Sequence, residues 1–99
     1  MVEVRLFIFA SLRETFSEET TTDIKLGERQ WASCEELKVY LLDLLLERCH
    51  RRYGPEHKIK LPATKSFMLA INECFVDPSE PVSLEPNDHI AMIPPVSGG

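Results

Sequence analysis

The chain has 99 residues, 43% of them hydrophobic and 27% charged, which is typical of one globular domain and not of a disordered, collagenous or coiled-coil protein. Its 16 acidic residues outnumber 11 Lys and Arg, and the resulting net charge of −5 argues against nucleic acid as a partner. The most apolar stretch, residues 40–46, is too short to span a membrane, and residues 1–9 lack a signal-peptide pattern. We therefore expect a cytosolic protein without a membrane partner.

Two strands are predicted near the start of the chain. Residues 2–9 alternate in polarity, which predicts a strand with one wholly apolar face, and the second face becomes apolar toward Phe7 and Phe9. Residues 10–16 predict a short helical or turn segment. Residues 19–26 are rich in Thr and resume a strand pattern, which Gly27 ends.

A long helix is the best-specified element. Ser33 and Glu36 fit the S-x-x-E capping box, and Gly54-Pro55 marks the other end. Six residues at helical spacing form one apolar stripe that we expect to face the core, although a partner-binding helix is the alternative. They are Leu37, Tyr40, Leu41, Leu44, Leu45 and Cys49.

The C-terminal half is predicted to be a loop followed by strands. Residues 56–65 read as a loop, 67–72 as a strand and 74–76 as its short continuation after a turn. Residues 85–88 predict a turn into a final strand at 89–93. The long connection through the helix allows the first and last strands to be parallel. The predicted fold is α+β: a β-grasp roll at residues 1–93, with a mixed sheet packed on one main helix.

The cysteines and histidines do not predict a metal or disulfide site. They fall in different elements and lack C-x-x-C or triad spacing. We expect free, partly buried thiols and solvated or hydrogen-bonded histidines, with a catalytic thiol as the alternative. These residues are Cys34, Cys49, Cys74, His50, His57 and His89.

The last six residues, 94–99, are predicted to form a projecting tail. Pro94 and Pro95 cannot donate backbone hydrogen bonds and favour polyproline II, so they end the strand. Val96 and Ser97 lead to Gly98 and Gly99, which have no side chains and can thread a narrow channel. A frayed end without a role is the alternative. A terminal carboxylate is a poor electrophile, so it needs activation by a partner before it can react.

Four segments resemble the small subunits of molybdopterin synthases, and the likeness covers nearly the whole chain. They are residues 9–14 (FASLRE), 69–72 (LAIN) with Val76, 88–91 (DHIA) and the ending 93–99 (IPPVSGG). Where this family often has Gly-Asp before the last strand, the chain has Asn87-Asp88, and Asn tolerates a positive φ.

The resemblance implies a ubiquitin-like β-grasp protein that carries sulfur as a thiocarboxylate on Gly99. An E1-like adenylyltransferase and sulfurtransferase, using ATP, would load the sulfur. The tail, residues 94–99, would then enter the large synthase subunit, whose residues catalyse sulfur transfer to cyclic pyranopterin monophosphate in an assembly of two small and two large subunits. The chain itself would be no enzyme and bind no cofactor or metal.

Other functions of the same ending remain open. Carriers for thiamine synthesis or tRNA thiolation, and ubiquitin-like modifiers that form isopeptide bonds, also end in Gly-Gly on this fold; a plain interaction domain with an incidental tail is a further alternative. A patch of Phe7, Phe9, Met92 and Ile93 is a candidate for docking on the large subunit, with burial in the core as the competing interpretation.

Overall fold

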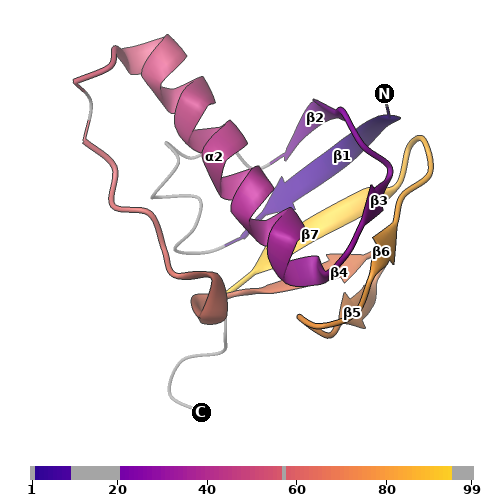
Figure 1. Cartoon of the computed structure of the whole chain (residues 1–99). Coiled ribbons are helices and arrows are strands. Elements are labelled where there is room, and N and C mark those ends of the chain that lie inside the picture. The colour runs from indigo at the N-terminus through magenta and orange to yellow at the C-terminus, as the bar shows by residue number, and fades with distance from the viewer. Residues whose placement is uncertain (1, 10–20, 57, 95–99) are drawn as a thin grey trace.

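The computed structural model describes residues 2–9, 21–56 and 58–94 (Figure 1). The elements in chain order are β1 (Val2–Ile8), β2 (Thr21–Leu26), β3 (Gln30–Trp31), α2 (Cys34–Tyr53), the 3-10 turn η1 (Thr64–Ser66), β4 (Met68–Ile71), β5 (Cys74–Val76), β6 (Val82–Ser83) and β7 (His89–Ile93). The predicted segment at residues 10–16 and the start of the second predicted strand, residues 19–20, lie outside the described residues.

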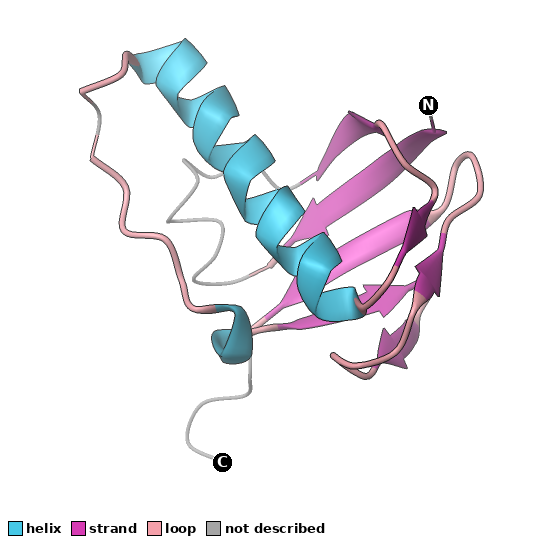
Figure 2. Ribbon diagram, viewed as in Figure 1, coloured by secondary structure: helices cyan, strands magenta, loops and turns pink. Residues whose placement is uncertain are grey.

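The main sheet is mixed, as predicted. Its strand order is β2-β1-β7-β4-β5, in which β1 and β7 are parallel and the other neighbouring pairs are antiparallel. Helix α2 lies across one face of this sheet (Figure 2), and it provides the crossover that parallel strands require. Strands β3 and β6 form a separate two-stranded ribbon. The fold is thus the predicted α+β roll of ubiquitin-like β-grasp type.

The core lies between α2 and the sheet, because each strand directs alternate residues toward the helix. In β1 the apolar residues Val2, Val4, Leu6 and Ile8 are buried, as their alternation predicts. They meet buried side chains from α2, from the other strands and from the residues next to β4 and β6. Among the largest of these are Leu26, Leu37, Leu41, Leu45, Phe67, Leu69, Leu84, Ile90 and Met92.

Helix α2 begins as predicted, and most of the predicted stripe faces the core: Leu37, Leu41, Leu45 and Cys49 are buried, and Leu44 is partly buried against them. The Ser33 hydroxyl accepts a hydrogen bond of 3.2 Å from the backbone N–H of Glu36, which is half of the expected capping box. Lys38, expected off the apolar stripe, is buried, while Tyr40, expected on it, is exposed and packs on Trp31 at 5.0 Å between ring centroids. The reason is tertiary: the β3 ribbon offers Tyr40 a partner outside the main core.

The strand boundaries differ slightly from prediction. Strand β4 begins at Met68 and ends at Ile71, because Asn72 and Glu73 both adopt positive φ in the tight turn to β5. Asn87 also has a positive φ, 71°, as its Asn-Asp turn predicts. The β3–β6 ribbon and η1 have no clear signal in the sequence, since both are shorter than a pattern can show. No helix in the described part of the chain combines the length and apolarity needed to cross a bilayer.

Candidate functional site: the outer sheet face and the end of strand β7

The last strand leads to the C-terminal residues from the middle of the sheet. β7 lies between β1 and β4, and Ile93, its final residue, pairs with Met68. On the other side the Phe9 N–H donates to the Met92 carbonyl at 3.3 Å. Pro94 follows at once and is half-buried. The C-terminal residues therefore begin between two strands whose positions are set by backbone hydrogen bonds.

Most of the predicted tail lies outside the described residues. Pro95, Val96, Ser97, Gly98 and Gly99 are in this group, so their roles stay predictions. Pro94 is described, and it ends β7 as predicted, since it has no N–H to donate to a neighbouring strand.

The sheet face opposite α2 carries a row of apolar residues across four strands. Phe7 of β1 pairs with Ala91 of β7, Ala91 with Ala70 of β4, and Ala70 with Phe75 of β5. Ala70 is only 4% exposed, so the residues around it form the surface here. Phe75 stands out from the surface, with 62% of its area exposed.

A second apolar row lies next to the first, at the end of β7. Phe9 and Met68 flank Ile93 and are 46% and 45% exposed. The residues that the register places beside the start of the tail are therefore apolar, and they offer binding surface but no acid or base. We call the two rows together the outer patch, which comprises Phe7, Phe9, Met68, Ala70, Phe75, Ala91 and Ile93. A contiguous apolar patch of this kind on a small protein is typical of an interaction site.

The predicted docking residues are only partly brought together. Phe7, Phe9 and Ile93 belong to the outer patch, but Met92 was wrongly placed there, because it is fully buried on the helix side. Neighbouring residues of a strand point to opposite faces, so Met92 and Ile93 cannot share one. The sequence did not reveal that Met68 and Phe75 complete the patch. The alternation of residues 68–76 could indicate that Met68 and Phe75 face away from the core. It could not indicate that their strands lie beside β7.

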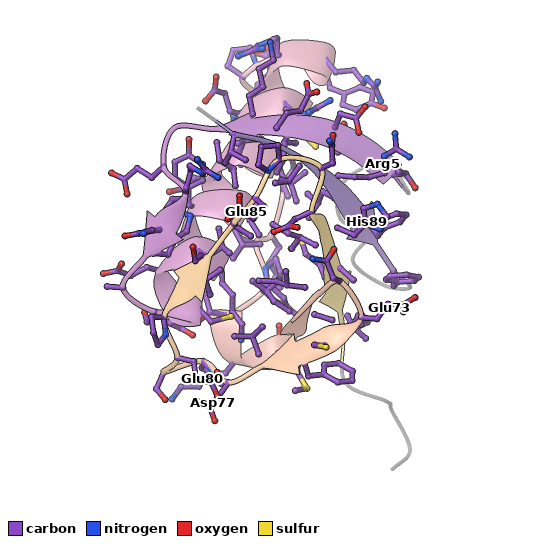
Figure 3. All side chains as sticks on the ribbon, turned by 90° about the vertical axis from the view of Figure 1, so that its right-hand side faces the viewer. Arg5, Glu73, Asp77, Glu80, Glu85 and His89 are labelled. Carbon is purple, nitrogen blue, oxygen red and sulfur yellow. The ribbon has the colours of Figure 1, made fainter. Side chains whose placement is uncertain are left out.

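Polar side chains border the outer patch on the side away from the tail. His89 lies opposite Arg5 in the strand register, and its ring meets Phe7 edge-on at 5.3 Å. Arg5 also forms an exposed ion pair with Asp23, with 3.0 Å between Nε and Oδ1. Figure 3 shows Arg5 and His89 next to each other, with the carboxylates of Asp77 and Glu80 together at another edge of the molecule.

Among the described residues, the pKa is shifted for two groups, Asp77 and Cys34, and neither lies in the outer patch. The backbone N–H and then the hydroxyl of Ser79 donate to Asp77 at 2.9 and 2.7 Å, and these hydrogen bonds lower the pKa of its carboxyl. Burial raises the pKa of the Cys34 thiol, which lowers its reactivity. Both the electrostatics and the packing indicate a structural role for Cys34.

The cysteines are free, as predicted: Cys34 and Cys49 are buried and Cys74 is exposed on β5. Within residues 2–9, 21–56 and 58–94, no group of three or more His, Cys, Asp or Glu side chains is arranged to hold a metal ion. A groove beside α2 and β2 has a lining of mixed charge that includes Asp23, Lys25, Glu47 and Arg51, so it favours no single kind of charged ligand.

Solved structures with the same fold come from bacteria and archaea. The small archaeal modifier protein 1 of Methanosarcina acetivorans is 25% identical, with a TM-score of 0.59 over 100% of this chain and 98% of that one. A Pyrococcus furiosus protein assigned as molybdopterin converting factor subunit 1 is 22% identical, with a TM-score of 0.59 over 97% and 100%. A complex of subunits 1 and 2 of molybdopterin-converting factor from Helicobacter pylori gives 19% identity and 0.54 over 99% and 100%.

The sequence itself matches a family model over almost its whole length. The match covers residues 6–99, from the middle of β1 to the final glycine, and so includes both the outer patch and the Gly-Gly ending. The resemblance identified from the sequence is confirmed at this level, and the chain belongs to the ThiS family of ubiquitin-like β-grasp proteins.

Proposed function

We propose that this chain is the sulfur-carrying small subunit of a molybdopterin synthase. The observation that carries the proposal is that the central strand β7 ends at Ile93 and Pro94 beside the exposed outer patch, and that the sequence goes on from there as Pro95-Val96-Ser97-Gly98-Gly99. Family membership supports a carrier role, and the double proline before Val-Ser-Gly-Gly favours molybdopterin over thiamine or tRNA thiolation.

The chemistry occurs at the carboxylate of Gly99. A partner of the E1-like class adenylates it with ATP and releases pyrophosphate, which turns a poor electrophile into a reactive acyl-adenylate. A sulfur donor then displaces AMP, leaving a thiocarboxylate. In the large subunit the thiocarboxylate sulfur bonds to cyclic pyranopterin monophosphate, and water then cleaves the acyl C–S bond, which leaves the sulfur on the pterin and restores the Gly99 carboxylate for another cycle. The role of this chain is to present the terminus.

The large subunit is the expected docking partner of the outer patch. The Helicobacter pylori complex pairs a subunit 1 of this fold with a subunit 2, which supports a partner of that kind here. The patch is apolar near the tail and edged by Arg5 and His89 farther away, an apolar centre with a polar rim that is common in protein interfaces. Two small and two large subunits are the proposed assembly.

Reconstitution tests the loading step first. The purified chain is mixed with ATP, an activating enzyme and a sulfur donor, and its intact mass is measured. We expect the mass to rise by the difference between sulfur and oxygen at one position. A chain that lacks Gly99 is the control and stays unmodified. If the full chain is also unchanged, it is not a sulfur carrier.

The acceptor is tested second. The thiocarboxylated chain is incubated with a large synthase subunit and the pterin precursor, and formation of the dithiolene product is followed. Gly98→Val is the matched variant, because a β-branched side chain stiffens and widens the terminus. We expect it to be loaded but to transfer slowly. No product from the loaded wild-type chain would exclude the molybdopterin role.

A protein modifier is the second candidate function. The structure of the archaeal modifier protein at 25% identity is the observation that favours it. In that case the activated Gly99 forms isopeptide bonds with lysine side chains of other proteins, and incubation with ATP and a lysate yields a ladder of conjugates recognised by an antibody to the chain. A sulfur carrier without conjugating activity yields no ladder.

A further inference from the structure

Lys38 is a buried cation that has no carboxylate partner in the described part of the chain. Lys38 lies on the core-facing side of α2, and only 2% of the residue is exposed. Among the described residues no carboxylate forms a salt bridge with it. Burying an ammonium group is unfavourable unless its N–H groups are hydrogen-bonded. The surroundings of Lys38 on this side of the helix are apolar, since Leu37, Leu41 and Leu42 are buried next to it.

The Lys38 amine binds the backbone that leads into β4. Its Nζ donates to the carbonyl of Phe67 at 2.8 Å and to that of Thr64 at 3.0 Å, and it lies 5.3 Å from the centre of the Phe67 ring. A second tie comes from the same turn of the helix, where Glu35 accepts a hydrogen bond from the Thr64 hydroxyl. Together these contacts fasten η1 and Phe67 to α2.

The fastened segment continues directly into the end of the sheet where the tail begins. Phe67 precedes Met68, the first residue of β4, and Met68 pairs with Ile93, the last residue of β7 before Pro94. η1 lies at this end of the sheet (Figure 2). The amine of Lys38 is therefore connected to Ile93, the residue before the tail, by one hydrogen bond, one peptide unit and one strand pair.

We infer that Lys38 is a positioning residue for the C-terminal tail: it holds Phe67 and hence the Met68–Ile93 pair, which sets the direction in which the chain leaves the sheet. This inference deepens the proposed function, on which it rests, because the reacting carboxylate must reach a fixed point in the partner. A tail that leaves in a wrong direction docks through the outer patch but brings its terminus to the reaction site less often.

Two substitutions separate the hydrogen bonds of Lys38 from its bulk. Lys38→Met keeps an unbranched apolar chain and removes every donor, whereas Lys38→Arg keeps a cation with donors. Val2→Ala is the matched control: Val2 is equally buried but pairs with Leu26 at the opposite end of β1 from the tail. If Lys38→Met does not fold, Lys38→Gln takes its place: it keeps a neutral amide donor but loses the charge, and we expect a smaller fall in order at Met68 and Ile93.

The first measurement uses the isolated chain and requires no partner. Backbone amide relaxation by NMR reports the order of Met68 and Ile93 in each variant. We expect order to fall at both residues in Lys38→Met, to recover in Lys38→Arg and to stay unchanged in Val2→Ala at a similar loss of thermal stability. Wild-type order at Met68 and Ile93 in Lys38→Met would overturn the inference.

The second measurement separates docking from transfer. Each variant is loaded as the thiocarboxylate, and single-turnover transfer is measured at saturating large subunit together with the Kd of the complex. For Lys38→Met we expect the rate to fall about tenfold while the Kd changes less than about twofold. A wild-type rate in Lys38→Met overturns the inference and leaves the proposed function intact. If the wild-type chain itself transfers nothing, the proposed function is wrong, and the NMR measurement alone decides whether Lys38 orders this end of the sheet.

Discussion

Replacing Phe75 by alanine tests whether the outer patch is the surface that docks on the large subunit. An aromatic side chain buries about 150–250 Å² when it is fully enclosed, and 62% of Phe75 is exposed in the free chain, so about 120 Å² is left for a partner to cover. At about 25 cal/mol per Å², this area corresponds to about 3 kcal/mol. Binding also loses side-chain freedom, so we expect the Kd to rise by one to two orders of magnitude, that is, about 10- to 100-fold.

The same substitution leaves the fold almost unchanged. Phe75 lies on β5, an edge strand of the sheet, and its ring has few contacts to lose. We expect the free energy of unfolding to fall by no more than about 1 kcal/mol in urea titration. The affinity is measured by isothermal titration calorimetry with the large subunit.

Val39→Ala is the matched control for Phe75→Ala. Val39 is an exposed apolar residue on α2, on the other side of the sheet, so its truncation removes apolar area away from the outer patch. We expect no change in the Kd. Equal affinities for wild-type and Phe75→Ala chains would show that docking does not use this face, and the assignment of the outer patch would have to be abandoned.

Three other predictions concern the ending, a turn and the thiols. Deleting Gly99 abolishes loading in the intact-mass assay while the melting temperature stays that of the wild type; a matched loss of thermal stability would place the terminus in the core instead. Glu73→Gly stabilises the chain by about 0.5 to 1 kcal/mol in urea titration, because Asn72 and Glu73 have φ of 51° and 73° in a two-residue hairpin turn where Asn-Gly is favoured; a loss of stability would contradict this account of the turn. A disulfide reagent at pH 8 modifies Cys74 quickly and Cys34 only after unfolding, since burial raises the pKa of the Cys34 thiol and shields it; fast modification of Cys34 in the folded chain would show that the core opens there.

Much of the local structure could be predicted because its signals lie close together in the chain. The alternation of residues 2–8 is the burial pattern of β1, and Ser33 caps α2 through the N–H of Glu36 three residues on. The parallel pairing of β1 with β7 agrees with the sequence, which allowed it because the connection is long enough to cross over. These inferences need only spacing and stereochemistry.

Errors arose where one element decides the surroundings of another. Tyr40 and Lys38 exchange their expected environments: Tyr40 packs on Trp31 of the short ribbon at the surface, and two backbone carbonyls accept hydrogen bonds from Lys38 in the interior. The two carbonyls that bind Lys38 are far from the helix in sequence. They belong to Thr64 and Phe67, 26 and 29 residues away. Helical periodicity alone cannot show such contacts.

The candidate site divides in the same way. The sequence by itself was enough to predict the chemistry of the ending, because proline lacks a backbone donor and glycine lacks a side chain in any fold. Only the tertiary structure decided which surface accompanies that ending. Residues along a strand face the core alternately, so pairing β7 with its neighbours places Met92 in the core and excludes it from the outer patch. Phe7 and Phe75 are nearly 70 residues apart in the chain. Only the register of β1, β7, β4 and β5 shows that they share a face.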